Sequence, residues 1–360
     1  MTAQFTLGLV LAPSTQRMAA TWILRKGSAK AGFRYMDEDG RAVRDGRTLA
    51  RIDALRVPPA WRDVHVAIGA RRTIQAWGFD ARGRKQYRYH ESAVATRELR
   101  KYHRVRELAK ALPRIRRTLR AQSHQRELTC DTVCAIALRL ISESLFRPGS
   151  EKYVRENRSY GMTTMRKRHV QVERERVVFS YMGKSGQKQR QLVTNPELVR
   201  LVARLHRTPG ERLFRYRENG KGAWLDLGAT TLIDHLRGDI GPFAVKDFRT
   251  WGGTLRAATV LAELGPARSL TEAKRNVALA MRIVAAELGN TAAICRSSYV
   301  HPMVLARYVD EGETIAVRHP SKRGPDAFAH SSEERALIAF LDRHFPERRR
   351  RPRPLVARAA

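Results

Sequence analysis

The chain has 360 residues, of which 42% are hydrophobic, and its formal net charge is +34. This length accommodates two or three domains with a sizeable buried core. So large an excess of positive charge predicts a polyanionic partner such as nucleic acid, bound with a strong salt dependence. The alternative, positive charge spread evenly over the surface for solubility, is less favoured. An anionic membrane surface would attract the same charge, but no stretch approaches the ~20 apolar residues of a membrane span. We therefore expect no membrane partner.

Cysteine usage indicates a reducing compartment. The sequence has three cysteines, Cys130, Cys134 and Cys295. An odd, low count is typical of the cytosol, and Met1 to Leu11 lack the basic start of a secretory signal. Together with the nucleic-acid partner that the charge predicts, this count leads us to expect a cytoplasmic, nucleoid-associated location. Cys130 and Cys134 are one helical turn apart, but no Cys or His at metal-site spacing completes a zinc site, so no metal or other cofactor is expected.

The N-terminal part is expected to be rich in β-structure. Residues 1–20 show no clear period and are expected to be flexible, whereas residues 21–92 hold short apolar or aromatic runs between turn signals. Residues 84–90 alternate polar and aromatic types, so Gln86 shares one strand face with Arg88 and Tyr87 shares the other with Tyr89. Such a strand suits contact with a phosphate backbone and base edges, although an ordinary sheet with an aromatic core face explains it equally well.

From about residue 93 the period becomes helical, and residues 93–346 are predicted to form one mainly helical domain. Residues 97–120 combine an apolar stripe with a dense cationic face, which favours a polyanion partner. Leu128 to Phe146 is predicted as a buried helix that ends at Arg147-Pro-Gly149. An arginine at that end is well placed to point into a cleft. A short helix over residues 150–156 follows and displays Lys152 and Tyr153.

Residues 169–193 are predicted to form a three-stranded antiparallel sheet with a turn at Gly183-Lys-Ser-Gly186. This turn is not a nucleotide-binding phosphate loop, because Val178 stands where that loop needs glycine and strands flank it on both sides. No nucleotide partner is expected. Lys184 is then either a solvated hairpin lysine or a lysine aimed at a site. The fold class predicted is α+β, with a small β-rich N-terminal domain and a larger helical domain that contains this sheet.

Residues 196–290 are predicted to be mostly helical, and a helix over Lys246-Asp-Phe-Arg249 presents its lysine and arginine on one side. A later amphipathic helix begins at a capping box of Ser269 and Glu272, and Gly289 ends it. Asn290 is expected to be exposed at the turn, a second short helix carries Tyr299, and Pro302 opens the next helix. The basic tail over residues 347–360 is expected to be disordered.

A tyrosine at helical spacing is ordinarily a core residue, so Tyr299 acquires meaning only from its companions in the chain. These are Arg147, Lys184, Arg249 and Asn290. Phosphodiester cleavage by a protein nucleophile uses all of these residue types. Arginines stabilise the charged non-bridging oxygens, a phenol attacks and can later leave, a lysine protonates the departing hydroxyl, and an amide adds a hydrogen bond.

Five motifs in one order resemble those of the type IB DNA topoisomerases, in their short poxvirus-like and bacterial form. The resemblance extends from about Thr21 to Phe345. The motifs are Gly83-Arg-Lys-Gln-Tyr-Arg-Tyr89, Phe146-Arg-Pro-Gly-Ser-Glu-Lys-Tyr153, Gly183-Lys-Ser-Gly186, Lys246-Asp-Phe-Arg-Thr-Trp-Gly252, and Leu288-Gly-Asn-Thr291 with Ser298-Tyr-Val300. No single motif is specific, but their combination and order are.

The resemblance implies the site residues and their roles. Tyr299 would attack the phosphate and leave a 3′-phosphotyrosyl link, Arg147 and Arg249 would stabilise the transition state, and Lys184 would protonate the leaving oxygen. Asn290 stands where poxvirus enzymes have histidine, and keeps a hydrogen bond without acid or base chemistry. Ser150 stands where the poxvirus pattern has a lysine, which removes one base contact. The implied DNA-contacting residues are Gln86, Tyr87, Tyr89, Lys152, Tyr153 and Lys246.

The resemblance also implies an isomerase that acts on double-stranded DNA as a monomer. It would relax supercoils by strand rotation and religation, without ATP or metal, while two domains joined near Ser92 enclose the duplex. A tyrosine recombinase uses a similar catalytic domain and the same covalent link, but generally carries a helical DNA-binding arm in place of the β-rich N-terminus predicted here. The third alternative is a non-catalytic basic DNA-binding protein, in which the five candidate residues would not converge.

Overall fold

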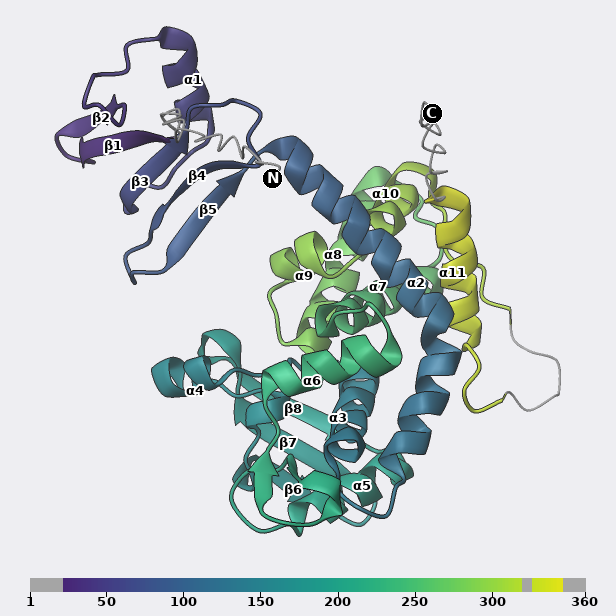
Figure 1. Cartoon of the computed structure of the whole chain (residues 1–360). Helices are drawn as coiled ribbons and strands as arrows, with labels where there is room; N and C mark the ends of the chain where they lie inside the picture. The colour runs from purple at the N-terminus through teal and green to yellow at the C-terminus, as the bar shows by residue number, and fades with distance from the viewer. Residues whose placement is uncertain (1–21, 319–325, 346–360) are drawn as a thin grey trace, which may run out of the picture. The chain divides into compact units, whose positions relative to one another are not determined.

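The computed structural model describes residues 22–318 and 326–345 (Figure 1). The chain divides into two compact units, residues 1–99 and 100–360. The division falls inside helix α2 (Glu91–Ser123), a few residues past the boundary that composition predicts. The first unit is built on a β-sheet, and the second is mainly helical with small sheets, which confirms the α+β class.

The first unit is a five-stranded antiparallel sheet in the order β2-β1-β3-β4-β5. Its strands are β1 (Trp22–Ser28), β2 (Gly32–Met36), β3 (Arg62–Ala67), β4 (Ile74–Phe79) and β5 (Lys85–Tyr89). A short helix, α1 (Gly46–Ala54), interrupts a region where the sequence predicts strands and turns alone. Its local cause is Asp45, whose carboxylate accepts a hydrogen bond from the Thr48 amide at 2.8 Å and so caps the helix.

The aliphatic side of this sheet forms the core, and the aromatic side does not. Ile23, Val64, Val66 and Ala76 pack with Ile52 of α1. The alternate positions on the same strands carry a ladder of rings, in which His65 stacks on Trp77 with centroids 3.9 Å apart and Trp22 meets both edge-on. Tyr87 pairs with Trp77 across β4 and β5 and is 40% exposed. The alternation of β5 is confirmed, and the alternative of an aromatic core face is wrong.

The second unit surrounds the buried helix α3 (Cys130–Ser144), which contacts the predicted three-stranded sheet at β8 (Figure 1). The sheet is antiparallel in the order β6-β7-β8, as predicted, with β6 (Val170–Val172), β7 (Val177–Met182) and β8 (Lys188–Val193). The other helices are α4 (Glu151–Asn157), α5 (Pro196–His206), α6 (Ala229–His235), α7 (Val245–Leu264), α8 (Leu270–Leu288), α9 (Ala292–Ser298), α10 (Pro302–Glu311) and α11 (Ser332–His344). A hairpin of β9 (Arg215–Arg217) and β10 (Trp224–Asp226) interrupts the region predicted as mostly helical.

The cationic face predicted for α2 is in large part a set of internal ion pairs. Arg104 holds both carboxylate oxygens of Asp247 at 2.6 and 2.8 Å, and Arg116 pairs with Glu334 at 2.6 Å. Arg106 is only 2% exposed and lies 3.5 Å from Asp342. These arginines join α2 to other helices of its unit, and the carboxylates that they contact offset their positive charge. The charge of residues 97–120 is therefore partly neutralised within the fold, which a count of charges along the helix does not reveal.

Helix α8 begins and ends as its sequence predicts, with one difference. Ser269 Oγ accepts a hydrogen bond from the Glu272 amide at 3.1 Å, but the Glu272 carboxylate accepts from the amide of Arg268, one residue before the cap. The predicted apolar stripe is buried over its whole length. Within the described ranges no single helix has the length and hydropathy of a membrane span. Helices α8 and α9 have that length and hydropathy only when they are taken together, and a 93° bend separates them.

Candidate active site

The corner between α8 and α9 is formed by a left-handed glycine and a threonine cap. Gly289 has a φ of +58°, which glycine adopts at little cost, and a Cβ there would collide with the side chain of Gln189. The Thr291 hydroxyl accepts from the Ile294 amide at 3.3 Å and starts α9. Tyr299 is the C-terminal cap of α9, one residue past the helix that is predicted to carry it, and Pro302 opens α10 as predicted. Asn290 is partly buried at this corner and not exposed, which corrects the sequence-based expectation.

Arg147 reaches this corner from the end of α3. The helix ends at Leu145, whose φ is +57°, and the Arg147 carbonyl accepts a hydrogen bond from the Met162 amide at 2.8 Å. These contacts fix the backbone, and the Arg147 Nη2 donates to the Gly289 carbonyl at 2.9 Å and to Asn290 Oδ1 at 2.6 Å. The arginine and the amide are therefore held as a unit.

Arg249 lies beside them on α7 and is 2% exposed. Its Nη2 donates to the Leu288 carbonyl at 2.9 Å, and its Nη1 donates to the Leu145 carbonyl. The guanidinium thus joins the C-terminal ends of α3 and α8, where carbonyl groups lack helical partners. Burial lowers the pKa of Arg249, and the neighbouring charge of Arg147 lowers it further. An arginine remains cationic after such a shift, because its ordinary pKa is above 12.

Tyr299 faces two cations. Lys246 Nζ and Arg249 Cζ each lie 5.2 Å from the centroid of its ring. Burial of the phenol acts to raise its pKa, but the charges of Arg249, Lys246 and Arg147 outweigh it, and the pKa of Tyr299 lies below its ordinary value of 10. The phenolate is the nucleophilic form, so these cations favour the state that attacks.

Tyr181, on β7, lies near the same two arginines, but its pKa shifts in the opposite direction because burial dominates. It is 8% exposed, and its hydroxyl donates to Gln191 Oε1 at 3.1 Å. Burial raises the pKa of Tyr181 to about 12, although Arg147 and Arg249 act to lower it. Two tyrosines therefore lie within the field of this arginine pair, and only Tyr299 is made more acidic. Sequence reasoning missed Tyr181, although its inward position in the alternation of β7 is the signal that could have found it.

The cluster contains donors that have no acceptor. Among the described residues, Asn290 Nδ2 and Arg249 Nε are buried and make no hydrogen bond. Unpaired buried donors are costly, and in native proteins they call for an explanation. Since Arg147 holds the oxygen of the Asn290 amide, the nitrogen is fixed in place. A bound anion with several acceptor oxygens, such as a phosphodiester, would satisfy these donors.

Lys184 lies on the exposed turn between β7 and β8, where Ser185 and Gly186 both have positive φ values of 64° and 70°. In the described parts of the chain, its ammonium forms no hydrogen bond or ion pair. The geometry therefore brings Arg147, Arg249, Asn290 and Tyr299 together, with Lys246 added, and leaves Lys184 on a hairpin outside their contacts.

The remaining DNA-contact candidates are dispersed. Lys152 and Tyr153 lie on α4, where Tyr153 is 49% exposed and Lys152 pairs with Glu156 at 3.8 Å. Gln86 donates to Asp80 Oδ2 at 2.9 Å, which fixes the end of β5. The rings of Tyr87 and Tyr89 stack with centroids 5.9 Å apart on the aromatic face of the first sheet.

Sequence reasoning also missed Asp247, the residue between Lys246 and Arg249 that anchors their helix. Its carboxylate is buried, pairs with Arg104, and accepts a hydrogen bond from the Ala244 amide at 2.7 Å. The signal was present, since a carboxylate in the first turn of a helix is a common capping pattern.

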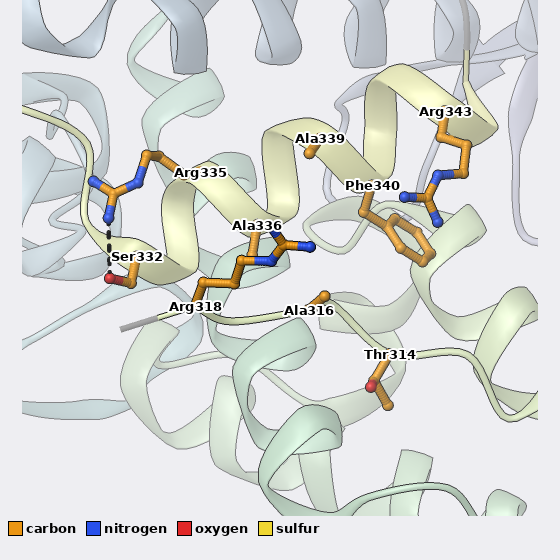
Figure 2. Close-up of a pocket in the computed structure, with 9 residues that line it drawn as sticks. All are labelled: Thr314, Ala316, Arg318, Ser332, Arg335, Ala336, Ala339, Phe340 and Arg343. Carbon is orange, nitrogen blue, oxygen red and sulfur yellow. Dashed lines mark hydrogen bonds between the residues drawn. The ribbon is translucent and has the colours of Figure 1, made fainter. Parts of the chain in front are cut away.

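Two other features of the second unit lie outside this cluster. The Nδ1 atom of His235 is 3.3 Å from Asp131 and 3.2 Å from Asp239. These three side chains are of types that could hold a divalent cation, and neither cysteine of α3 is among them. A cavity of about 300 Å³, drawn in Figure 2, lies between α11 and the segment around Ala316. It is lined by arginines and Phe340, and none of the candidate site residues contributes to it.

The site thus defines a class: a phenol with a lowered pKa, held beside an arginine pair and an amide with an open donor, is suited to transfer of a phosphoryl group to tyrosine. Residues 84–319 match the family described as eukaryotic DNA topoisomerase I, catalytic core, and residues 32–80 match bacterial DNA topoisomerase IB, N-terminal domain.

Individual relatives agree with these matches. The chain is 30% identical over 297 residues to the DNA topoisomerase 1B of Acanthamoeba polyphaga mimivirus, and the aligned region covers 80% of this chain and 87% of that protein. It is 22% identical over 249 residues to the DNA topoisomerase 1B of Vaccinia virus (strain Copenhagen), and the aligned region covers 65% of this chain and 72% of that protein. The chain belongs to the type IB DNA topoisomerase family.

Proposed function

We propose that the protein relaxes supercoiled duplex DNA as a type IB topoisomerase, through a transient 3′-phosphotyrosyl link at Tyr299. The observation that carries this proposal is the contact of one tyrosine with two cations, Arg249 and Lys246, beside the hydrogen-bonded pair of Arg147 and Asn290. Family membership gives the reaction class, and this geometry supports the assignment of the residues to it.

In the cleavage step the Tyr299 oxygen attacks the phosphorus, and the bond to the 5′ oxygen of the leaving strand breaks. Negative charge concentrates on the non-bridging oxygens in the transition state. Arg147, Arg249 and the Asn290 amide would donate to those oxygens, and the unpaired Arg249 Nε and Asn290 Nδ2 are two of the contact points. Since these groups are fixed by carbonyl contacts before DNA arrives, little reorganisation is needed at the moment of reaction.

The departing 5′ oxygen takes up a proton, and we assign this role to Lys184. The support is that its hairpin turn is exposed and the ammonium has no described partner, so the side chain can move to bound DNA. A lysine has protons to donate and suits a general acid. Asn290 cannot take this role, because an amide carries no titratable proton.

Between the two steps the cut strand rotates, and its 5′ hydroxyl then attacks the phosphotyrosine to restore the phosphodiester and release Tyr299. The covalent link conserves the energy of the broken bond, so we propose that neither ATP nor metal is required. We also propose that one chain acts alone on double-stranded DNA, with contacts from Gln86, Tyr87, Tyr89, Lys152 and Tyr153. A cytoplasmic, nucleoid-associated location is supported by the cysteine count and the net charge of +34.

The test is relaxation of a supercoiled plasmid that carries no recombination site, in EDTA and without ATP. The parent protein should relax the plasmid in steps, and a Tyr299→Phe variant should bind the plasmid but not relax it. Full relaxation by Tyr299→Phe would remove this tyrosine from the mechanism. Relaxation that appears only after addition of ATP or a divalent cation would contradict the proposed energetics.

A further inference from the structure

The backbone that carries Tyr299 rests directly on helix α7. We refer to Tyr299, Val300 and His301 as the strap, because they connect α9 to α10. A Cβ added at Gly253 of α7 would lie 2.9 Å from the Tyr299 carbonyl oxygen and 3.5 Å from the Tyr299 Cβ. Glycine is therefore required at this point, since any larger residue would push the strap away from the helix.

The next residue of α7, Thr254, binds the strap through its hydroxyl. Thr254 is fully buried, at 0% exposure. Its Oγ1 accepts a hydrogen bond from the His301 amide at 3.0 Å, lies 2.7 Å from the Thr250 carbonyl, and is 3.4 Å from the Tyr299 carbonyl. A hydroxyl has one proton, and the short distance assigns it to Thr250. The oxygen of Thr254 is thus the acceptor for a buried strap amide.

A second hydrogen bond to the strap comes from helix α2. The Tyr102 hydroxyl of α2 donates to the Val300 carbonyl at 3.0 Å, and this carbonyl belongs to a fully buried residue. The two hydrogen bonds immobilise the peptide groups that follow the tyrosine. Its side chain then has little freedom beyond its own two torsion angles.

Helix α7 consequently positions both the Tyr299 phenol and the cations that face it. Its first turns carry Lys246 and Arg249, which face the Tyr299 ring, and Gly253 and Thr254 hold the backbone of the same tyrosine. A helix is rigid over this length, so the separation between phenol and guanidinium is set within one element. Misplacement of a reacting group by 1 Å can slow a reaction by about a hundredfold.

We propose that Thr254 is a positioning residue for DNA cleavage, which acts through the strap and not through contact with DNA. The proposal rests on the proposed role of Tyr299. Replacement of the hydroxyl by a methyl group, in Thr254→Val, conserves shape and burial but leaves the His301 amide without its acceptor. The strap would shift to find a new partner, and the phenol would leave its alignment with Arg249.

Helix α7 offers a matched control. Thr250 is also 0% exposed, and its Oγ1 donates to the carbonyl four residues before it, that of Lys246, at 2.9 Å. No strap residue bonds to its hydroxyl in the described parts of the chain. Thr250→Val therefore makes the same chemical change on the same helix, without the loss of the strap contact.

The measurement is the single-turnover rate of covalent complex formation at saturating DNA, together with the Kd for DNA and the thermal midpoint of each variant. Thr254→Val should cleave more slowly by about ten- to a hundredfold with an unchanged Kd, and Thr254→Ser, which keeps the hydroxyl, should recover most of the rate. Thr250→Val should cleave at the parent rate. Thr254→Ala provides a second variant without the hydroxyl if the valine variant folds poorly.

Parent-like cleavage by both Thr254→Val and Thr254→Ala would overturn the proposal, as would equal slowing by Thr250→Val. A change confined to the thermal midpoint would leave Thr254 with a purely structural role and would also overturn it. Failure of the proposed function gives a different result, because the parent would then form no covalent complex or Tyr299→Phe would still form one.

Discussion

Exchange of Asn290 for aspartate separates stability from catalysis at the proposed phosphate site. The parent amide uses its oxygen to accept from Arg147 Nη2 at 2.6 Å, and its nitrogen is buried without a partner. Asn290→Asp keeps the shape and the acceptor, converts a hydrogen bond into an ion pair, and removes the donor. A negative charge is also introduced where a phosphoryl group would lie.

The two consequences have opposite signs. Loss of one donor to a developing oxyanion costs about 10²–10³ in rate, or roughly 2.7–4 kcal/mol, and the added charge increases the loss. The new ion pair with Arg147 is partly buried and should contribute about 0.5–1 kcal/mol, so the Tm should equal or exceed that of the parent. Single-turnover cleavage of an end-labelled duplex and a thermal melt measure the two effects.

Asn276 provides the control, since it lies on α8 about 18 Å along the helix from the corner. Its Nδ2 donates to the Tyr308 hydroxyl at 2.8 Å, so Asn276→Asp should lower the Tm and leave cleavage unchanged. Cleavage by Asn290→Asp at the parent rate would refute the assignment of the Asn290 amide to the phosphoryl group.

Further predictions follow from other contacts of the fold. Lys184→Ala should cleave much more slowly, and a 5′-thio leaving group, which needs little protonation, should restore much of the rate; no rescue would exclude the general-acid role. The cleavage rate should rise with pH and level off below pH 10, because the pKa of Tyr299 is lowered despite its burial, and Arg249→Gln should move the inflection upward. Hydrogen bonding to Arg120 lowers the pKa of Glu197 from 4.5 to about 2. The stability that this carboxylate contributes is therefore present above pH 4.5 and lost as the pH falls through about 2, so Glu197→Gln should lower the Tm at pH 7 but not near pH 2. DNA affinity should fall on the order of a thousandfold between 50 and 200 mM salt if ~6 phosphates are contacted, and a salt-independent Kd would contradict a polyanion site.

The regular elements could be predicted because their signals are local. Ser269 and Pro302 mark helix starts and Gly289 marks a helix end, and the alternation of residues 170–193 predicts the three strands of the second unit. Caps and period-two patterns can be read locally because they depend on neighbours in sequence. Helix α1 was missed because it is short, and its one strong signal, the cap at Asp45, lies between runs typical of strands.

The site could be predicted only in part, since its geometry depends on contacts between distant residues. The sequence provides the arginines and Tyr299, but not the bond from Arg147 to Asn290, which joins residues 143 positions apart. The same holds for the cationic face of α2, where the partners Asp247 and Glu334 lie more than a hundred residues away. A count of charges along one helix carries no information about such partners.

The covalent attachment point tests the central claim most directly. Cleavage of a 5′-end-labelled duplex should transfer the label to the protein, because the tyrosine bonds to the 3′ phosphate of the labelled fragment. After digestion with trypsin, mass spectrometry should find the nucleotide adduct on the peptide of residues 297–307, which contains Tyr299. An adduct on the peptide of residues 177–184, which contains Tyr181, or label released with the free strand, would contradict the account.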